Sequence, residues 1–143
     1  MSSVQNIPNL TFQNKYQAKV TLDYSNVASM KQTHSNNVIE VEKEGIYNAD
    51  GLITSVKNLK LVVFTADCMP VVLIDNSKIG AIHIGWKGLE NKIFYKALEH
   101  FNKNQLKVFI GPHAKNCCYE IKNDLQVKFP NYTMTNDKKL YLD

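Results

Sequence analysis

The sequence contains no arginine, and all 17 of its basic residues are lysines. Bidentate, fork-shaped clamping of a phosphate is therefore not expected at the site to which its motifs point. The formal net charge is +4, and the lysines are scattered along the chain rather than clustered. This charge fits weak attraction of small anionic ligands, but it gives poor support for nucleic-acid binding.

Long hydrophobic runs are also missing. No apolar run approaches the roughly 18 residues of a membrane-spanning helix, and the N-terminal stretch MSSVQNIPNLTFQNKYQ lacks the apolar segment of a signal peptide. Cysteines are few, and two of the three, Cys117 and Cys118, are adjacent. Adjacent cysteines bridge each other only with strain. Reduced thiols, a cytoplasmic location and no membrane partner are therefore expected.

The length and composition are those of one domain. The chain has 143 residues, of which 44% are hydrophobic and 21% charged, enough for a sizeable core. We therefore expect a single domain over residues 1–143. The sequence stops on the apolar-rich YTMTNDKKLYLD, without a polar tail, which suggests that the natural chain continues and that this domain is truncated at its C-terminus.

Hydrophobic patterning predicts six strands and one helix. Residues 16–24 and 37–44 alternate in the manner of half-buried strands. Residues 59–66 and 106–112 are nearly continuous apolar runs, typical of strands covered on both faces. Residues 71–75 and 79–85 flank the turn-rich NSK and predict a hairpin. The helix is expected over 89–104, because one face carries the apolar stripe Ile93, Phe94, Ala97, Leu98 and Phe101.

Candidate chemistry gathers around Cys68, which sits beside Asp67 in FTADCMP, directly after the predicted strand 59–66. His34 precedes a predicted strand and His83 ends one. Two histidines and a thiolate can form a three-ligand zinc site that keeps a fourth position for water or substrate. Cys68 follows His34 by 34 residues and precedes His83 by 15, however, and such spacings match no local zinc motif.

Structural roles are equally open for these residues. A single histidine at a strand end is usually a hydrogen-bonded structural residue, and a single buried cysteine is usually a small inert side chain. Asp67 would then cap a strand end. His100 lies on the charged side of the predicted helix, and His113 lies in a Gly-Pro turn, so neither is favoured as a ligand.

Five motifs in order change this balance. They are Gln32-Thr33-His34, Asp50 to Thr54 (DGLIT), Thr65 to Pro70 (TADCMP), His83 to Gly88 (HIGWKG), and Ile110-Gly111-Pro112 with Cys118-Tyr119-Glu120. Together they resemble the laccase-domain family, also called the YfiH/YlmD, multicopper polyphenol oxidase or peptidoglycan editing factor family. The resemblance runs from about residue 30 to the end of the chain.

The resemblance implies an α+β fold of mixed β-sheets flanked by helices, related to a group of cysteine hydrolases. It assigns the metal ligands to His34, Cys68 and His83. Cys68, His83 and Asp67 are the expected catalytic residues, with Asp67 as a general base or an orienting group. Substrate binding is expected at Cys118 and at Lys87, Gly85 and Gly88, whose amides or ammonium group would recruit phosphate.

Three departures from the family pattern stand out. Ser35 follows His34 where the family usually has glycine, and Lys87 replaces the usual arginine, which keeps the charge but loses a fork-shaped contact. The chain also ends before a further helical stretch and a late arginine-rich motif. If that segment closes the pocket, activity would be weakened.

The function implied by the resemblance is zinc-dependent action on purine nucleosides. It comprises phosphorolysis of adenosine, inosine or methylthioadenosine, and deamination of adenosine. Copper is the less favoured metal, because a multicopper oxidase needs many more histidines than the four present. Two alternatives stay open. One is a peptidoglycan-precursor editing hydrolase with Cys68 as thiolate nucleophile and His83 as base, without metal. The other is a truncated, non-catalytic binding domain. The preferred substrate and the oligomeric state are not determined by the sequence.

Overall fold

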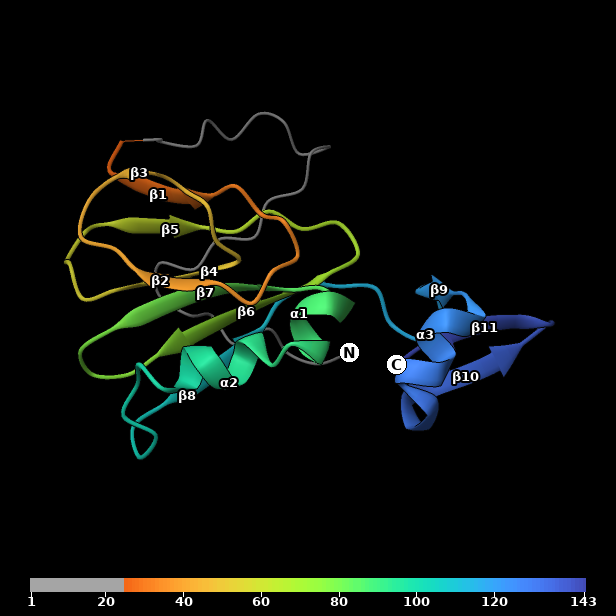
Figure 1. Cartoon of the computed structure of the whole chain (residues 1–143). Helices are drawn as coiled ribbons and strands as arrows, with labels where there is room; N and C mark the ends of the chain where they lie inside the picture. The colour runs from red at the N-terminus through yellow and green to blue at the C-terminus, as the bar shows by residue number, and fades with distance from the viewer. Residues whose placement is uncertain (1–24) are drawn as a thin grey trace.

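The centre of the fold is a mixed five-stranded sheet with the order β2-β4-β7-β6-β8 (Figure 1). The structure is a computed structural model and describes residues 25–143. In this sheet β2 is parallel to β4 and the other neighbours are antiparallel. Its strands are β2 (Val38–Glu40), β4 (Gly51–Thr54), β7 (Ile79–Ile84), β6 (Met69–Ile74) and β8 (Lys107–Ile110). The predicted α+β class with mixed sheets is confirmed.

A smaller parallel sheet and two short helices cover opposite faces of the central sheet (Figure 1). The smaller sheet has the order β3-β1-β5. Neighbouring residues of β4 show why three layers form, because Leu52 packs into the core beneath the small sheet and Ile53 into the core beneath the helices. Both side chains are fully buried. The elements of the two outer layers are β3 (Gly45–Tyr47), β1 (Val27–Met30), β5 (Lys60–Val62), α1 (Trp86–Glu90) and α2 (Ile93–Leu98).

The C-terminal residues form a small lobe beside α1 (Figure 1). Its core contains Ile121, Leu125 and Leu142, with Trp86 of α1 packed against it. Lys128 ties the lobe to α1, since its Nζ lies 2.6 Å from Glu90 and 5.0 Å from the centroid of the Trp86 ring. The elements of the lobe are β9 (Glu120–Ile121), α3 (Asn123–Lys128), a 3-10 turn (Pro130–Tyr132), β10 (Thr133–Asn136) and β11 (Lys139–Leu142).

The predicted hairpin is confirmed as β6 and β7, which pair over six residues each. The apolar stripe of the predicted helix is also confirmed, because all five of its residues pack in the core beneath the helices. The continuous helix over 89–104 is wrong. Lys92 adopts a left-handed conformation with φ 60° and separates α1 from α2. After Leu98 the chain continues in i→i−3 hydrogen bonds, which still bring Phe101 into the core.

Two strands predicted to be covered on both faces are edge strands instead. The run 59–66 forms only β5, which ends the order of the small sheet, and its residues are half-buried or exposed. The run 106–112 forms β8 at the edge of the central sheet, where Ile110 is 59% exposed. The strand predicted over 37–44 is reduced to β2, and the one over 16–24 lies outside the described residues. Within residues 25–143, no helix has both the length and the apolar character needed to cross a bilayer.

The turn between β6 and β7 is organised by Asp75. Its carboxylate accepts hydrogen bonds from the amides of Asn102, Ser77 and Lys78 and from the Ser77 hydroxyl. Partial burial alone would raise the pKa of Asp75, but these hydrogen bonds outweigh it and lower the pKa to about 2. Because the folded pKa lies below the unfolded one, the contribution of Asp75 is present above the unfolded pKa and is lost as the pH falls toward 2.

We therefore expect Asp75→Asn to lower the melting temperature at neutral pH by on the order of 5 °C. The difference from wild type should narrow as the pH is lowered below about 4. Circular-dichroism melts of both proteins across this range measure it. Glu42→Gln is the matched control, since it removes a carboxylate from an exposed turn. An equal loss in both variants, or a gap independent of pH, would contradict the role given to Asp75.

Candidate metal and substrate site

A pocket of about 580 Å³ opens where β6 begins and β7 ends. It is lined by residues from the loops after β1 and β5, from β7 and α1, and from the segment before β9. The lining residues are Gln32, His34, Phe64, Thr65, Ala66, Asp67, Cys68, His83, Trp86 and Tyr119. A volume of this size is within the range of small-molecule sites, about 300–1,000 Å³.

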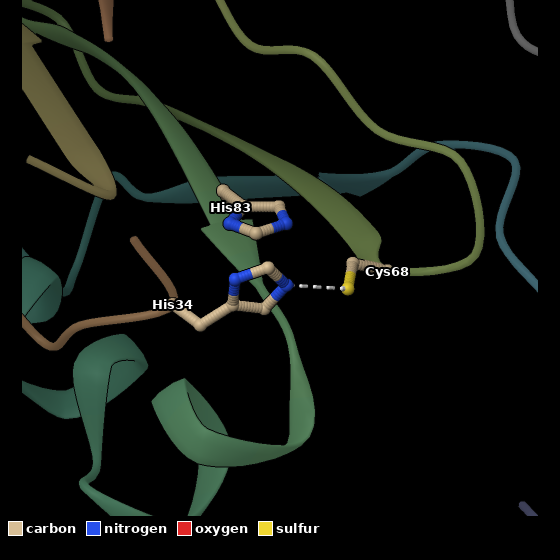
Figure 2. Close-up of side chains that lie close together, drawn as sticks. All are labelled: His34, Cys68 and His83. Carbon is tan, nitrogen blue, oxygen red and sulfur yellow. Dashed lines mark hydrogen bonds between the residues drawn. The ribbon is translucent and has the colours of Figure 1, made fainter. Parts of the chain in front are cut away.

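Within this pocket His34, Cys68 and His83 converge (Figure 2). One ligand atom from each residue lies within 4.8 Å of the others. Nε2 of His34 is 3.7 Å from Sγ of Cys68. The imidazole rings of His34 and His83 lie edge to face, with 4.8 Å between their centroids. Ligands of one zinc ion each lie about 2.0–2.3 Å from it, so small side-chain adjustments would let all three atoms bind the same ion.

The β6–β7 register explains why two of these residues meet. Met69 pairs with Ile84 and Pro70 with His83, so Cys68, which directly precedes β6, lies beside Gly85, which directly follows β7. The carbonyl of Pro70 also accepts a hydrogen bond from Gly111. Cys68 is therefore fixed by strand pairing on both sides of β6, although its own side chain remains only half-buried.

Asp50 fixes the orientation of His83. It precedes β4, is fully buried, and its Oδ1 lies 2.8 Å from Nδ1 of His83. An ionised carboxylate only accepts hydrogen bonds, so Nδ1 carries the proton and Nε2 is left as the ligand atom of His83. A carboxylate behind a histidine ligand is a common means of orienting the ring and raising its basicity.

The same carboxylate holds the backbone of the His34 loop. It accepts hydrogen bonds from the amides of Thr33, His34 and Ser35 at 3.2, 3.0 and 2.7 Å, and from the Ser35 hydroxyl at 2.6 Å. His34 itself has a φ of 60°, a left-handed conformation that is uncommon for a residue with a side chain. Burial would raise the pKa of Asp50, but the hydrogen bonds from Ser35 and His83 and from the backbone lower it. Ser35 thus adds a hydroxyl contact that glycine would lack.

Gly85 leaves the space in which the three side chains meet. A methyl carbon on Gly85 would lie 2.7 Å from Cδ2 of His34 and 3.1 Å from Sγ of Cys68. The first separation is too short for any carbon contact, so the residue after β7 has to be glycine for His34 to sit where it does.

The charges around the cluster favour a cation. Burial, followed by the negative charges of Asp67 and Asp50, raises the pKa of the Cys68 thiol. Burial also raises the pKa of Tyr119, with further contributions from Cys68 and Asp67. A bound cation offsets such charges and favours the thiolate form that ligates metals. The residues present therefore fit a metal of the zinc or copper type, which accepts nitrogen and sulfur ligands.

The other predicted residues are placed as follows. Asp67 is exposed in the pocket wall. Lys87 is exposed just outside it, with Nζ 5.5 Å from the centroid of the Trp86 ring. Gly88 is buried against Ile93 and Ser35, and Cys118 is exposed and does not line the pocket. The roles expected for these residues stay predictions.

Several contributors were missed by reasoning from the sequence. Asp50 was quoted only as part of a motif, although an acidic residue directly before the four buried residues of β4 is a usable signal. Trp86 and Tyr119 lie within quoted motifs, but their spacing does not indicate a shared pocket. Gln32 and Phe64 also lie within quoted stretches, but the two hydrogen bonds between the Gln32 side chain and the Phe64 backbone have no sequence pattern.

Gly85→Ala should weaken metal binding without unfolding the protein, because the added methyl group displaces His34 and Cys68. We expect zinc affinity to fall at least ten-fold, measured by competition with a chromogenic chelator. Gly80→Ala is the matched control. It adds a methyl group 3.0 Å from Cζ of Phe101 in the core, so it should lower the melting temperature and leave zinc affinity near wild type. Wild-type affinity in Gly85→Ala would refute the steric argument.

Asp50→Asn should lower zinc affinity about 10–100-fold, as loss of a partner behind a histidine ligand typically does. Ser35→Ala removes one of the five hydrogen bonds to Asp50, so it should remain folded and lose less affinity. Zinc titration of both variants, alongside thermal melts, separates ligand orientation from stability. If folded Asp50→Asn bound zinc as tightly as wild type, the orienting role would be wrong.

Comparison with known proteins identifies the family of the chain. Residues 4–142 match the family described as multi-copper polyphenol oxidoreductase laccase. Curated relatives named purine nucleoside phosphorylase come from Clostridium acetobutylicum, with 35% identity over 82% of this chain and 53% of the relative, and from Borreliella burgdorferi, with 36% identity over 80% and 58%. The chain thus spans somewhat more than half of the length of these relatives.

Solved structures share the fold. The YfiH protein of Bacillus licheniformis is 26% identical and superposes with a TM-score of 0.74, covering 85% of this chain and 56% of that one. YlmD of Geobacillus stearothermophilus, 21% identical, gives a TM-score of 0.72 over 84% and 55%. With a family match along nearly its whole length, a His-Cys-His cluster and the YfiH fold, this chain belongs to the laccase-like YfiH family.

Proposed function

We propose that His34, Cys68 and His83 hold a zinc ion and that the surrounding pocket acts on purine nucleosides. The observation that carries the proposal is the convergence of these three side chains, with Nε2 of His83 left as a ligand atom by Asp50. The curated relatives named purine nucleoside phosphorylase supply the substrate class. The family description names copper, but two histidines and one cysteine fall far short of a multicopper set.

Four histidines are too few for a multicopper oxidase, and two of them are engaged elsewhere. His100 lies 3.6 Å from Glu40, and Nδ1 of His113 donates a hydrogen bond to the carbonyl of Gly111. In residues 25–143, His34, Cys68 and His83 are the one group of three or more candidate ligands. A single site with three protein ligands is typical of catalytic zinc.

The main reaction proposed is phosphorolysis of inosine, adenosine or methylthioadenosine. A phosphate oxygen forms a bond to C1′ of the sugar as the C1′–N9 bond breaks. The electron pair of that bond stays on the base, which takes up a proton and leaves as free purine. The products are a pentose 1-phosphate and the base. Deamination of adenosine, with water adding at C6 and ammonia leaving, is proposed as a second reaction of the same pocket.

The side chains of the chain would divide these tasks. When bound, zinc supplies Lewis-acid polarisation at its open position. His34, Cys68 and His83 would hold the ion at the pocket, and Asp67 in the pocket wall would exchange a proton with substrate or water. Lys87, which lies beside Trp86, and the backbone amides near Gly85 and Gly88 would attract phosphate. The Lys87 ammonium group would act as a point charge, without the bidentate contact that an arginine makes.

A metal-free hydrolase acting on a peptidoglycan precursor is the second candidate. The 3.7 Å contact between Nε2 of His34 and Sγ of Cys68 favours it, and it would make His34 rather than His83 the base of the pair. The raised pKa of the Cys68 thiol opposes it, because a thiolate nucleophile without a metal needs its pKa lowered by neighbouring positive charge.

Zinc-loaded wild type should contain about one zinc per chain and release free base from inosine and adenosine only when phosphate is present. Cys68→Ala should lose both the metal and the turnover, because it removes a ligand. Cys117→Ala, which removes an exposed thiol outside the pocket, is the matched control and should behave as wild type. Chromatography of the reaction mixtures and elemental analysis provide the two readouts.

A chelator distinguishes the candidates. It should abolish nucleoside turnover, and added zinc should restore it. Cleavage of a muramyl-peptide precursor that survives the chelator would favour the Cys–His hydrolase instead. An active Cys68→Ala protein would refute both assignments.

A further inference from the structure

Phe64 is an exposed aromatic residue in the wall of the pocket that holds the His-Cys-His cluster. The residue is 56% exposed, and it lines the same pocket as Cys68 and His83. It lies two residues after the end of β5, in the loop that ends at Cys68 four residues further on. An apolar ring left facing water has an unfavourable hydration free energy that a planar ligand can remove by covering it.

The backbone of Phe64 is held in a two-point clamp by the side chain of Gln32. Oε1 of Gln32 accepts a hydrogen bond from the Phe64 amide at 2.8 Å, and Nε2 donates one to the Phe64 carbonyl at 2.7 Å. The clamp satisfies both backbone groups of Phe64 outside any strand while it leaves the ring uncovered. Since Gln32 stands two residues before His34, it also joins the ring-bearing loop to the loop that carries a metal ligand.

The remaining aromatic residues of the pocket are more fully engaged. Trp86 has the Nζ atoms of Lys87 and Lys128 at 5.5 and 5.0 Å from its ring centroid and packs against the C-terminal core. Tyr119 is half-buried in the same small core. Phe64 is therefore the aromatic residue of this pocket whose ring is exposed and whose backbone is fixed.

We propose that Phe64 is a specificity-determining residue that stacks on the heterocyclic base of the substrate, and that Gln32 positions it. The inference rests on the proposed function for the identity of the ligand. The Phe64 ring is held at the pocket wall and is accessible to ligand. It can stack on any planar heteroaromatic base, because stacking requires a π-face and no particular hydrogen-bonding pattern. Phe64 would then distinguish the purine from the sugar, and the His-Cys-His cluster would carry out the reaction.

The chain offers a direct reporter of pocket occupancy. Trp86 is its only tryptophan and lines the pocket, so its fluorescence should change when a base enters. Hypoxanthine, inosine and ribose 1-phosphate are titrated into zinc-loaded wild type, Phe64→Ala, Phe64→Leu and Phe64→Tyr. Tyr95→Ala is the matched control, because Tyr95 is a 67% exposed aromatic residue on α2 that does not line the pocket.

Phe64→Ala should weaken hypoxanthine binding and raise the KM for inosine by on the order of ten-fold, with kcat and ribose 1-phosphate binding nearly unchanged. Phe64→Tyr should bind as wild type, and Phe64→Leu should resemble Phe64→Ala. Gln32→Leu should weaken hypoxanthine binding as well, and it should add no further loss in the Phe64→Ala background, because both changes remove the same interaction.

The proposal is overturned if Phe64→Ala keeps wild-type hypoxanthine affinity, if it loses ribose 1-phosphate equally, or if Phe64→Leu restores binding. Its failure is separable from that of the proposed function. If Phe64→Ala loses base binding and wild type turns over no nucleoside, the stacking role of Phe64 stands and the proposed phosphorylase activity is refuted. If wild type turns over nucleoside and Phe64→Ala has an unchanged KM, the phosphorylase activity stands and the stacking role of Phe64 is refuted. Wild type that binds neither base nor nucleoside would refute both.

Discussion

The site depends on one buried carboxylate. Asp50 is fully buried and is surrounded by five hydrogen-bond donors, three of them backbone amides of consecutive residues. Burying a charge costs several kcal/mol unless its oxygens are satisfied, and here both oxygens are. The same contacts fix the left-handed backbone at His34 and the ring of His83. Two candidate ligands from distant parts of the sequence, His34 and His83, are thereby positioned by Asp50, which does not line the pocket.

This arrangement has an electrostatic consequence for any reaction in the pocket. Burial raises the pKa of the Cys68 thiol, and the negative charges of Asp67 and Asp50 raise it further, so the surroundings of Cys68 are negative. Phosphate would meet the same field, so an anionic co-substrate needs a compensating positive charge close to the cluster. Under the proposed function, a metal ion held by His34, Cys68 and His83 would supply that charge, and Lys87 and Lys128 near Trp86 would add positive charge at the margin.

Reasoning from the sequence succeeded where structure is local and failed where it is not. The β6–β7 hairpin and the apolar stripe of α2 follow from nearby residues, and both are present. The break at Lys92 has no such signal, because lysine seldom adopts positive φ. Edge strands such as β8 carry the same apolar run as central ones, so burial on both faces was expected and is absent. Residue type alone gave only weak support for His34, Cys68 and His83 as a metal site, because spacings of 34 and 15 residues carry no geometric information. The three residues were grouped only through the family resemblance of the ordered motifs.

The His-Cys-His cluster and the aromatic walls of the pocket are held by different parts of the fold. His83 lies in a central strand and His34 is anchored by Asp50, so both resist displacement. Phe64 lies on a loop, and Trp86 and Tyr119 are linked to the C-terminal lobe. Rigid elements hold reacting groups more accurately than loops, while loops accept substitution at little cost to the fold. Under the proposed function, changes at the walls would alter which substrate enters while the His-Cys-His cluster stays the same.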